Sequence, residues 1–136
     1  MLRTCLLALI CLTPIAAAAE GPKIRVELNK LEPKGANCQA YILLENQTDT
    51  GFENLSLDLV LFDGDGVIAR RLAVEMAPLR AGKTSVKVFG IDGLGCDTIG
   101  RLLVNDVLKC TSAGAARDDC LGLIETASRG SVELIN

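Results

Sequence analysis

The sequence predicts an all-β fold: an immunoglobulin-like antiparallel β-sandwich of about seven strands that carries two disulfides. Three observations predict this class. Apolar residues recur with a period of two rather than with a helical repeat, and Gly, Pro and Asp residues separate the apolar runs at a spacing typical of sandwiches. In addition, four of the six cysteines follow an export signal, and disulfides form in exported proteins.

Six segments show the alternation of a strand. The longest ladder has leucine at every second position from Leu55 to Leu61, and the opposite face becomes apolar at Val60 and Phe62, as in a central strand. The last stretch, 121–136, predicts either short strands or a helical turn near Asp118 and Asp119. The predicted strands cover residues 24–28, 40–44, 55–62, 67–74, 84–89 and 101–108.

The first 19 residues have the pattern of a signal peptide. Arg3 supplies positive charge, an apolar run follows, and Ala16 to Ala19 offer small residues to a signal peptidase, so we predict cleavage after Ala19. The apolar run is shorter than the ~20 residues that a bilayer-spanning helix needs. The sequence therefore predicts one β-sandwich domain over residues 20–136, no membrane span, and a periplasmic or secreted location.

The segment from Asp63 to Gly66, Asp-Gly-Asp-Gly, lies between two predicted strands. Gly and Asp tolerate the backbone conformations that a hairpin turn requires, so a turn explains each of these residues. Asp63 and Asp65 also have the alternate spacing of a calcium loop, but the next ligand position holds Val67 and the distal one holds Val74. A calcium site at Asp63 and Asp65 is therefore the alternative interpretation.

The cysteines of the mature chain allow three pairings. If successive strands alternate in direction, Cys38 and Cys96 lie at one end of the sandwich, and Cys110 and Cys120 lie at the other. This topology favours the disulfides Cys38–Cys96 and Cys110–Cys120. A zinc site or a redox pair is disfavoured, because the sequence has no Cys-x-x-Cys.

Histidine is absent from the chain, which excludes Ser-His-Asp, Cys-His and imidazole-metal chemistry. The carboxylate pairs Asp63 with Asp65 and Asp118 with Asp119 lie in turn-like segments. We therefore expect no catalytic residue, no cofactor and no metal. The formal net charge of −3 argues against nucleic acid as a partner, since that partner needs concentrated positive charge.

Two sets of residues support a resemblance to FxLYD-type domains. An Asn46-Gln47-Thr48 turn precedes a strand that ends at Phe62-Asp63, and the loop 78–84 opens the next strand. Leu59 stands where that family has its name-giving Phe. The whole chain, including segments 62–74 and 100–110, also resembles a group of exported alphaproteobacterial proteins often labelled as Tat pathway signal sequence domain proteins. The resemblance implies an immunoglobulin-like sandwich and no assigned activity.

Together these features predict a non-enzymatic, exported module that binds another envelope protein or stabilises an envelope assembly. An exposed strand edge is the expected means of binding, although the sequence does not say which edge. The alternative is a small-ligand or calcium-binding protein that uses the Asp63 and Asp65 loop.

Overall fold

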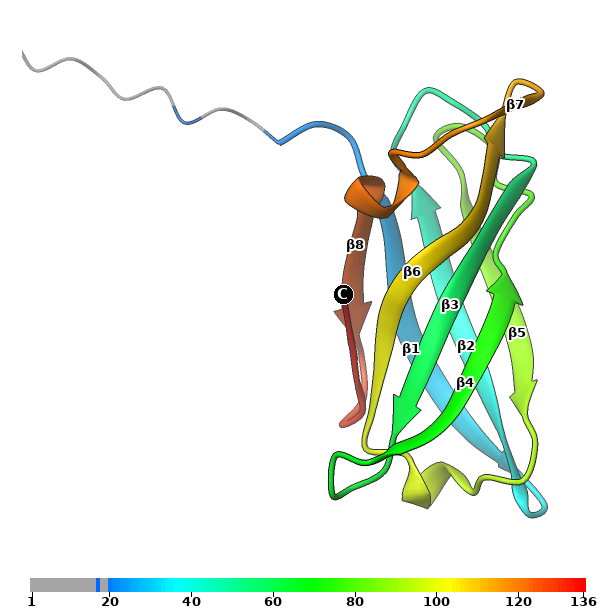
Figure 1. Ribbon diagram of the computed structural model, residues 1–136, viewed down its shortest axis with the longest axis vertical. Helices are drawn as coiled ribbons and strands as arrows, with labels where there is room; N and C mark the ends of the chain where they lie inside the picture. Colours follow the sequence, from blue (N-terminus) through cyan, green and yellow to red (C-terminus); the bar gives the residue numbers. More distant parts are fainter. Residues whose placement is uncertain (1–16, 18–19) are drawn as a thin grey trace, which may run out of the picture.

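The computed structural model describes Ala17 and residues 20–136 (Figure 1). The predicted signal peptide, apart from Ala17, lies outside the described residues. Strands dominate the fold, and two short 3-10 turns accompany them, η1 (Cys96–Thr98) and η2 (Cys120–Leu123). The strands are β1 (Ile24–Lys34), β2 (Asn37–Asn46), β3 (Asn54–Phe62), β4 (Ile68–Glu75), β5 (Thr84–Ile91), β6 (Arg101–Ser112), β7 (Ala115–Ala116), β8 (Ile124–Ser128) and β9 (Glu133–Ile135).

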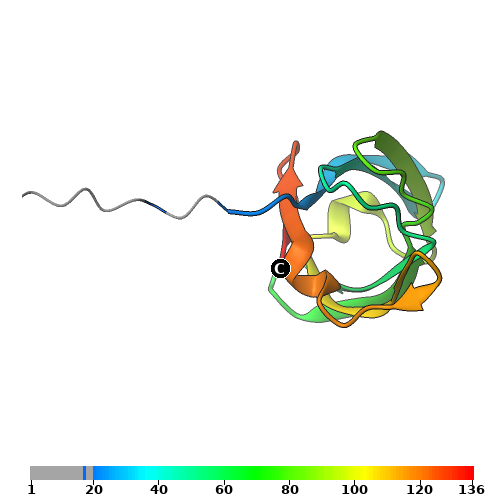
Figure 2. The same ribbon diagram turned by 90° about the horizontal axis from the view of Figure 1, so that it is seen from above.

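The strands form two sheets that pack as a sandwich, which confirms the predicted class. The first sheet has the order β5-β2-β1-β8, and the second has the order β4-β3-β6, with β7 and β9 both paired to β6. Seen from above, the two sheets curve around a common interior (Figure 2). No helix among the described residues is long and apolar enough to cross a membrane.

Two pairings differ from the wholly antiparallel arrangement that the sequence predicts. Strand β8 is parallel to β1, and β9 is parallel to β6. Both belong to the ambiguous stretch 121–136, which begins with the turn η2 and then forms these two short strands. The description as immunoglobulin-like stays a prediction, and the described part of the chain contains nine strands rather than about seven.

The core follows the period-two pattern of the central strands. On β2, Cys38, Ala40, Ile42 and Leu44 are buried, and each residue between them is partly exposed. On β3 the leucines 55, 57, 59 and 61 are all at most 1% exposed. The alternation therefore identified the inward faces, because successive side chains of a strand point to opposite sides of the sheet.

Strand β1 extends beyond its predicted end at Leu28. A bulge shifts its register between Leu28 and Lys30, and pairing with β2 then continues to Lys34. The strand also contains Pro33, which lies outside the strand predicted over residues 24–28. Strand β8 pairs with β1 only as far as Leu28, so one side of β1 is open at Pro33 and a proline without an N–H is tolerated there.

Both predicted disulfides are present. Cys38 bonds to Cys96 with a Cα–Cα distance of 4.9 Å, and Cys110 bonds to Cys120 with a Cα–Cα distance of 6.5 Å. They lie at opposite ends of the sandwich, as the expected alternation of strand direction predicted. The chain is thus fastened at both ends.

Candidate interaction surface

One side of the sandwich is closed by the C-terminal segment. Strand β8 belongs to the first sheet and β9 to the second, and side chains join them: Leu134 N–H donates to Ser128 Oγ at 2.7 Å, and Asn136 Nδ2 donates to the Ile124 carbonyl at 3.1 Å. At the opposite side, β4 and β5 end their sheets, and neither has a further strand beside it among the described residues. We call this the open side; β4 and β5 lie together on the right of Figure 1.

The hydrogen-bond register shows which backbone groups of β5 are free. Asn46 N–H donates to the Lys83 carbonyl at 3.0 Å, next to the Glu45–Thr84 pair of the β2–β5 ladder. Hydrogen-bonded and non-hydrogen-bonded pairs alternate along an antiparallel ladder. The backbone groups of residues 85, 87 and 89 therefore face β2, whereas those of residues 84, 86, 88 and 90 face outward.

Valines occupy the centre of this free edge. The exposed fractions of Val86 and Val88 are 62% and 40%, and their partners across the ladder are Leu43 and Tyr41. The four side chains share the outer face of the first sheet, and we call them the β5 apolar patch. Large exposed apolar residues gathered on one edge strand are typical of interaction sites.

Four cations lie on β5, on β4 or in the loop before β5, at the open side. Lys87 pairs with the buried Ile42, and Arg70 on β4 pairs with the buried Leu61, so both side chains lie on the inner faces of the edge strands. The Arg70 guanidinium reaches the loop after β5, since a Cβ at Gly93 would lie 3.3 Å from Arg70 Nη2.

The other two cations, Arg80 and Lys83, lie just before β5. They line a hollow of about 290 Å³ together with Pro78, Thr84 and Ser85. Within the described part of the chain, none of these four cations is in an ion pair. Six other basic residues are in ion pairs: Arg25, Lys30, Lys34, Arg71, Arg117 and Arg129. We call Arg70, Arg80, Lys83 and Lys87 the open-side cations.

On the outer face of the second sheet, in contrast, one buried carboxylate is paired with a cation. Asp58 is 2% exposed, and Arg71 donates hydrogen bonds to its carboxylate from Nε at 2.7 Å and from Nη2 at 2.6 Å. Asn105 Nδ2 donates a third bond at 2.7 Å. The Arg71 hydrogen bonds, followed by that from Asn105, lower the pKa of Asp58. This carboxylate is thus structural and offers no free acid or base.

Asp63 and Asp65 form the predicted turn. Asp63 Oδ1 accepts hydrogen bonds from the N–H groups of Asp65 and Val67, both at 2.9 Å, and the Asp63 N–H donates to the Val67 carbonyl at 2.8 Å. Gly66 has a φ of 80°, the left-handed conformation that glycine adopts without strain. Calcium binding at this loop stays a prediction, and a calorimetric titration with millimolar calcium tests it.

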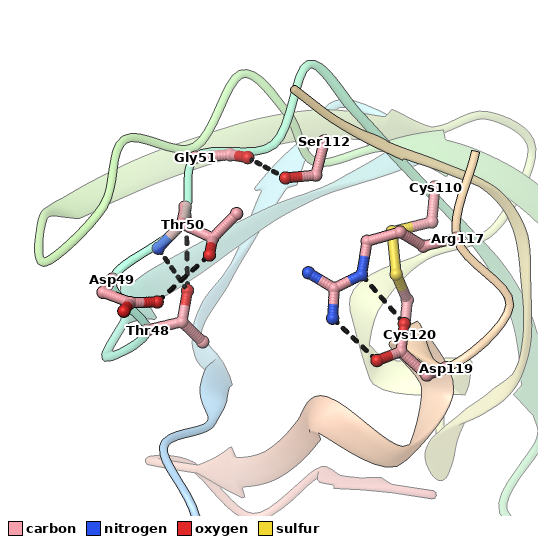
Figure 3. Close-up of polar contacts among 9 residues, drawn as sticks. All are labelled: Thr48, Asp49, Thr50, Gly51, Cys110, Ser112, Arg117, Asp119 and Cys120. Atoms are coloured by element: carbon pink, nitrogen blue, oxygen red, sulfur yellow. Dashed lines mark hydrogen bonds and ion pairs between the residues drawn. A yellow bond between two sulfur atoms is a disulfide. The ribbon is translucent and has the colours of Figure 1, made fainter. Parts of the chain in front are cut away.

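At the other end of the sandwich, the loops are joined by their own polar side chains (Figure 3). Ser112 Oγ donates to the Gly51 carbonyl at 2.8 Å, and Thr48 Oγ1 donates to the Thr50 carbonyl at 3.0 Å. Beside the Cys110–Cys120 disulfide, Arg117 binds both carboxylate oxygens of Asp119 at 2.8 and 2.7 Å. The Asp118 and Asp119 segment therefore contains one carboxylate that is already paired with a cation.

Sequence reasoning found strand 84–89 but not its position at an edge. The alternation of Val86, Lys87 and Val88 indicates a strand with two different faces, whichever neighbours it has. No signal for the edge was available in this alternation, because β2, which lies between β5 and β1, also has a single buried face. Arg70 gave no signal, because its place beside β5 depends on how the two sheets pack.

Comparisons with known proteins support the fold alone. No family model matches the chain, and neither does any curated protein. Among solved structures, the chain is similar to IrmA from Escherichia coli, with a TM-score of 0.57 and 17% sequence identity, over 78% of this chain and 92% of that one. At this identity, the likeness shows a shared β-sandwich architecture.

Proposed function

We propose that the chain is an exported, non-enzymatic module of the bacterial envelope that binds another protein through the free edge of β5. The observation that carries the proposal is the combination of outward-facing backbone groups with the exposed side chains of Val86 and Val88. A polypeptide in an extended conformation can bind such an edge as an added strand.

The disulfides support an extracytoplasmic location, because such bonds persist in oxidising compartments and are rare in the cytosol. The absence of histidine from the whole sequence supports a non-enzymatic role, since the commonest general base and nucleophile activator is missing. The paired state of Asp58 and Asp119 supports it further, because both carboxylates already accept hydrogen bonds from arginine.

Site-specific photo-crosslinking in living cells tests the proposal. A photoreactive residue at position 88 is expected to give discrete protein adducts in the periplasm, and the second substitution Val86→Pro is expected to reduce them. The control position is Lys109, which is exposed on β6 in the other sheet. Adducts that are equal at positions 88 and 109, or no adduct at any β5 position, would contradict the proposal.

A further inference from the structure

We propose that the β5 edge binds an extended, acidic segment of a partner protein, in which apolar residues opposite Val86 and Val88 alternate with carboxylates that face Lys87 and Arg70. This inference rests on the proposed function and adds the chemistry of the partner. It follows from three properties of the same edge: free backbone groups, an exposed apolar face and unpaired cations.

The backbone supplies the geometry. Residues 84, 86, 88 and 90 direct their N–H and C=O groups away from β2, as the register at Asn46 and Lys83 requires. A partner strand that bonds to these groups extends the first sheet by one strand. Its side chains must then alternate between the outer face, with Val86 and Val88, and the inner face, with Lys87.

The two faces ask for different residues. On the outer face, side chains of the added strand lie next to the β5 apolar patch, and they pack well against it only if they are apolar as well. On the inner face, Lys87 from β5 and Arg70 from β4 both lie at the open side and lack an ion pair among the residues that the structure describes. Carboxylates on the inner face of an added strand would therefore meet Lys87 beside the strand and Arg70 near the loop that follows β5.

The charge around the edge is also unusual for this chain. The protein has a formal net charge of −3, yet four open-side cations flank β5, and Arg80 and Lys83 line the hollow at its start. Two carboxylates lie nearby: Asp92 follows β5 directly, and Glu45, opposite Thr84 in the ladder, is paired with Arg25 at 3.5 Å. Opposite charges steer association and select against like-charged partners, so a basic edge on an acidic protein favours an acidic segment.

A second copy of the chain fits this edge less well. Pairing two β5 strands would bring the open-side cations of one copy against those of the other, and like charges across a strand pair are destabilising. Inward-pointing charges on an edge strand also discourage uncontrolled pairing. The same cations that oppose self-association therefore select an anionic strand.

Peptide binding to the mature protein tests the inference. The probe is a peptide of the length of β5, eight residues, in which valine alternates with glutamate; the matched control replaces each glutamate with lysine. Amide hydrogen exchange measured by NMR distinguishes the edge from the rest of the sheet. The glutamate peptide is expected to protect the amides of Val86 and Val88, whereas those of Lys87 and Phe89 are already bonded to β2.

Three variants separate the contributions of the Val86 N–H, the Lys87 charge and the Val86 side chain to peptide binding. Val86→Pro removes one outward N–H and leaves the β2 ladder intact, and it is expected to weaken binding at least about fivefold. Lys87→Glu is expected to weaken binding of the glutamate peptide about threefold or more and to improve binding of the lysine peptide. Val86→Thr keeps the N–H and serves as the control for loss of the apolar side chain. Melting curves confirm that each variant is folded.

The outcomes separate this inference from the proposed function. Equal binding of the two peptides, or protection outside β5, overturns the acidic-strand inference. Concentration-dependent protection of Val86 and Val88 without peptide also overturns it and identifies a second copy as the occupant. If neither peptide binds but position 88 still crosslinks in cells, the inference fails and the proposed function stands. If position 88 gives no adduct either, both fail.

Discussion

Asn46 illustrates how one side chain can hold two loops together. It is 2% exposed; its Nδ2 donates to the carbonyls of Thr50 and Arg80 at 2.8 and 3.1 Å, and its Oδ1 accepts from the Thr48 backbone N–H and hydroxyl. The amide therefore ties the end of β2 to the loop before β5. Through Arg80, it also helps to place the hollow at the start of the candidate interaction edge.

Asn46→Ala is expected to lower the free energy of unfolding by about 2–3 kcal/mol, because it leaves buried donors and acceptors without partners. The neighbouring Gln47 is exposed and provides the control, as Gln47→Ala should change the free energy by less than about 0.5 kcal/mol. Urea unfolding of the two variants measures both values. A neutral Asn46→Ala would show that the loops hold their positions without this amide.

Glu32, near the C-terminal end of β1, is expected to make the stability of the fold depend on pH. Its hydrogen bonds with Lys30 and then with Lys34 lower the pKa of Glu32 from 4.5 to about 2. A carboxylate whose pKa is lower in the folded state stabilises the fold above its unfolded pKa. This contribution is therefore present above about pH 4.5 and is lost as the pH falls toward 2.

The Glu32→Gln variant tests that dependence. It is expected to show a weaker loss of stability than the wild type between pH 4.5 and 2, the two pKa values of Glu32, and NMR titration of the wild-type carboxyl reports the folded pKa directly. The remaining slope belongs to other carboxylates whose pKa values are also lowered, among them Asp58 and Glu27. An unchanged slope in Glu32→Gln would mean that Glu32 contributes nothing to acid stability.

At the scale of elements, β3 and β5 differ in what they contribute. Strand β3 has neighbours on both sides, and its leucines fill the core, whereas β5 has β2 as its single neighbour among the residues that the structure describes and exposes both of its valines. The stability of the sandwich therefore depends on β3. Strand β5 is free to present side chains to a partner.

A matched pair of truncations measures this difference. Leu59, on β3, is 1% exposed, and Leu59→Ala is expected to cost about 2–5 kcal/mol because it removes buried contacts and leaves a cavity. Val86 is 62% exposed, and Val86→Ala is expected to change stability by less than about 0.5 kcal/mol. Chemical denaturation measures both. A large loss at Val86 would indicate that the edge valine stabilises the isolated protein.

At the scale of the whole molecule, the two sides and the two ends of the sandwich are connected in different ways. The β8–β9 segment links the sheets at one side, while the disulfides fasten both ends. The open side between β4 and β5 has neither a linking segment nor a disulfide within the described residues. This asymmetry leaves one edge of each sheet available without weakening the closed side.

Removing each disulfide tests how much the ends contribute. Cys38 and Cys96 are 58 residues apart in sequence, and Cys110 and Cys120 are 10 apart. The chain-entropy model then predicts that paired serine substitutions cost about 4 kcal/mol for the first bridge and about 3 kcal/mol for the second. Thermal and urea unfolding of the two double variants compare these losses. A larger loss from the shorter loop would show that native packing, rather than chain entropy, dominates.

The sequence by itself determined the features that depend on neighbouring residues. Alternation predicted the inward faces of β2 and β3, the Asp63 to Gly66 segment encoded its own turn, and the expected strand directions favoured the two disulfide pairings that the structure contains. These features are local, or follow from strand direction alone, so no knowledge of the packed sheets was needed.

Only the tertiary structure decided which strands are neighbours. The strands within residues 121–136 pair in parallel, one in each sheet. Asp58 is buried beneath Arg71, and Arg70 lies beside the loop after β5. Each result depends on contacts between segments far apart in the chain, and a strand alternates in the same way whether or not a partner occupies its second edge. The free edge of β5, and with it the candidate interaction surface, therefore emerges from the pairing of whole strands.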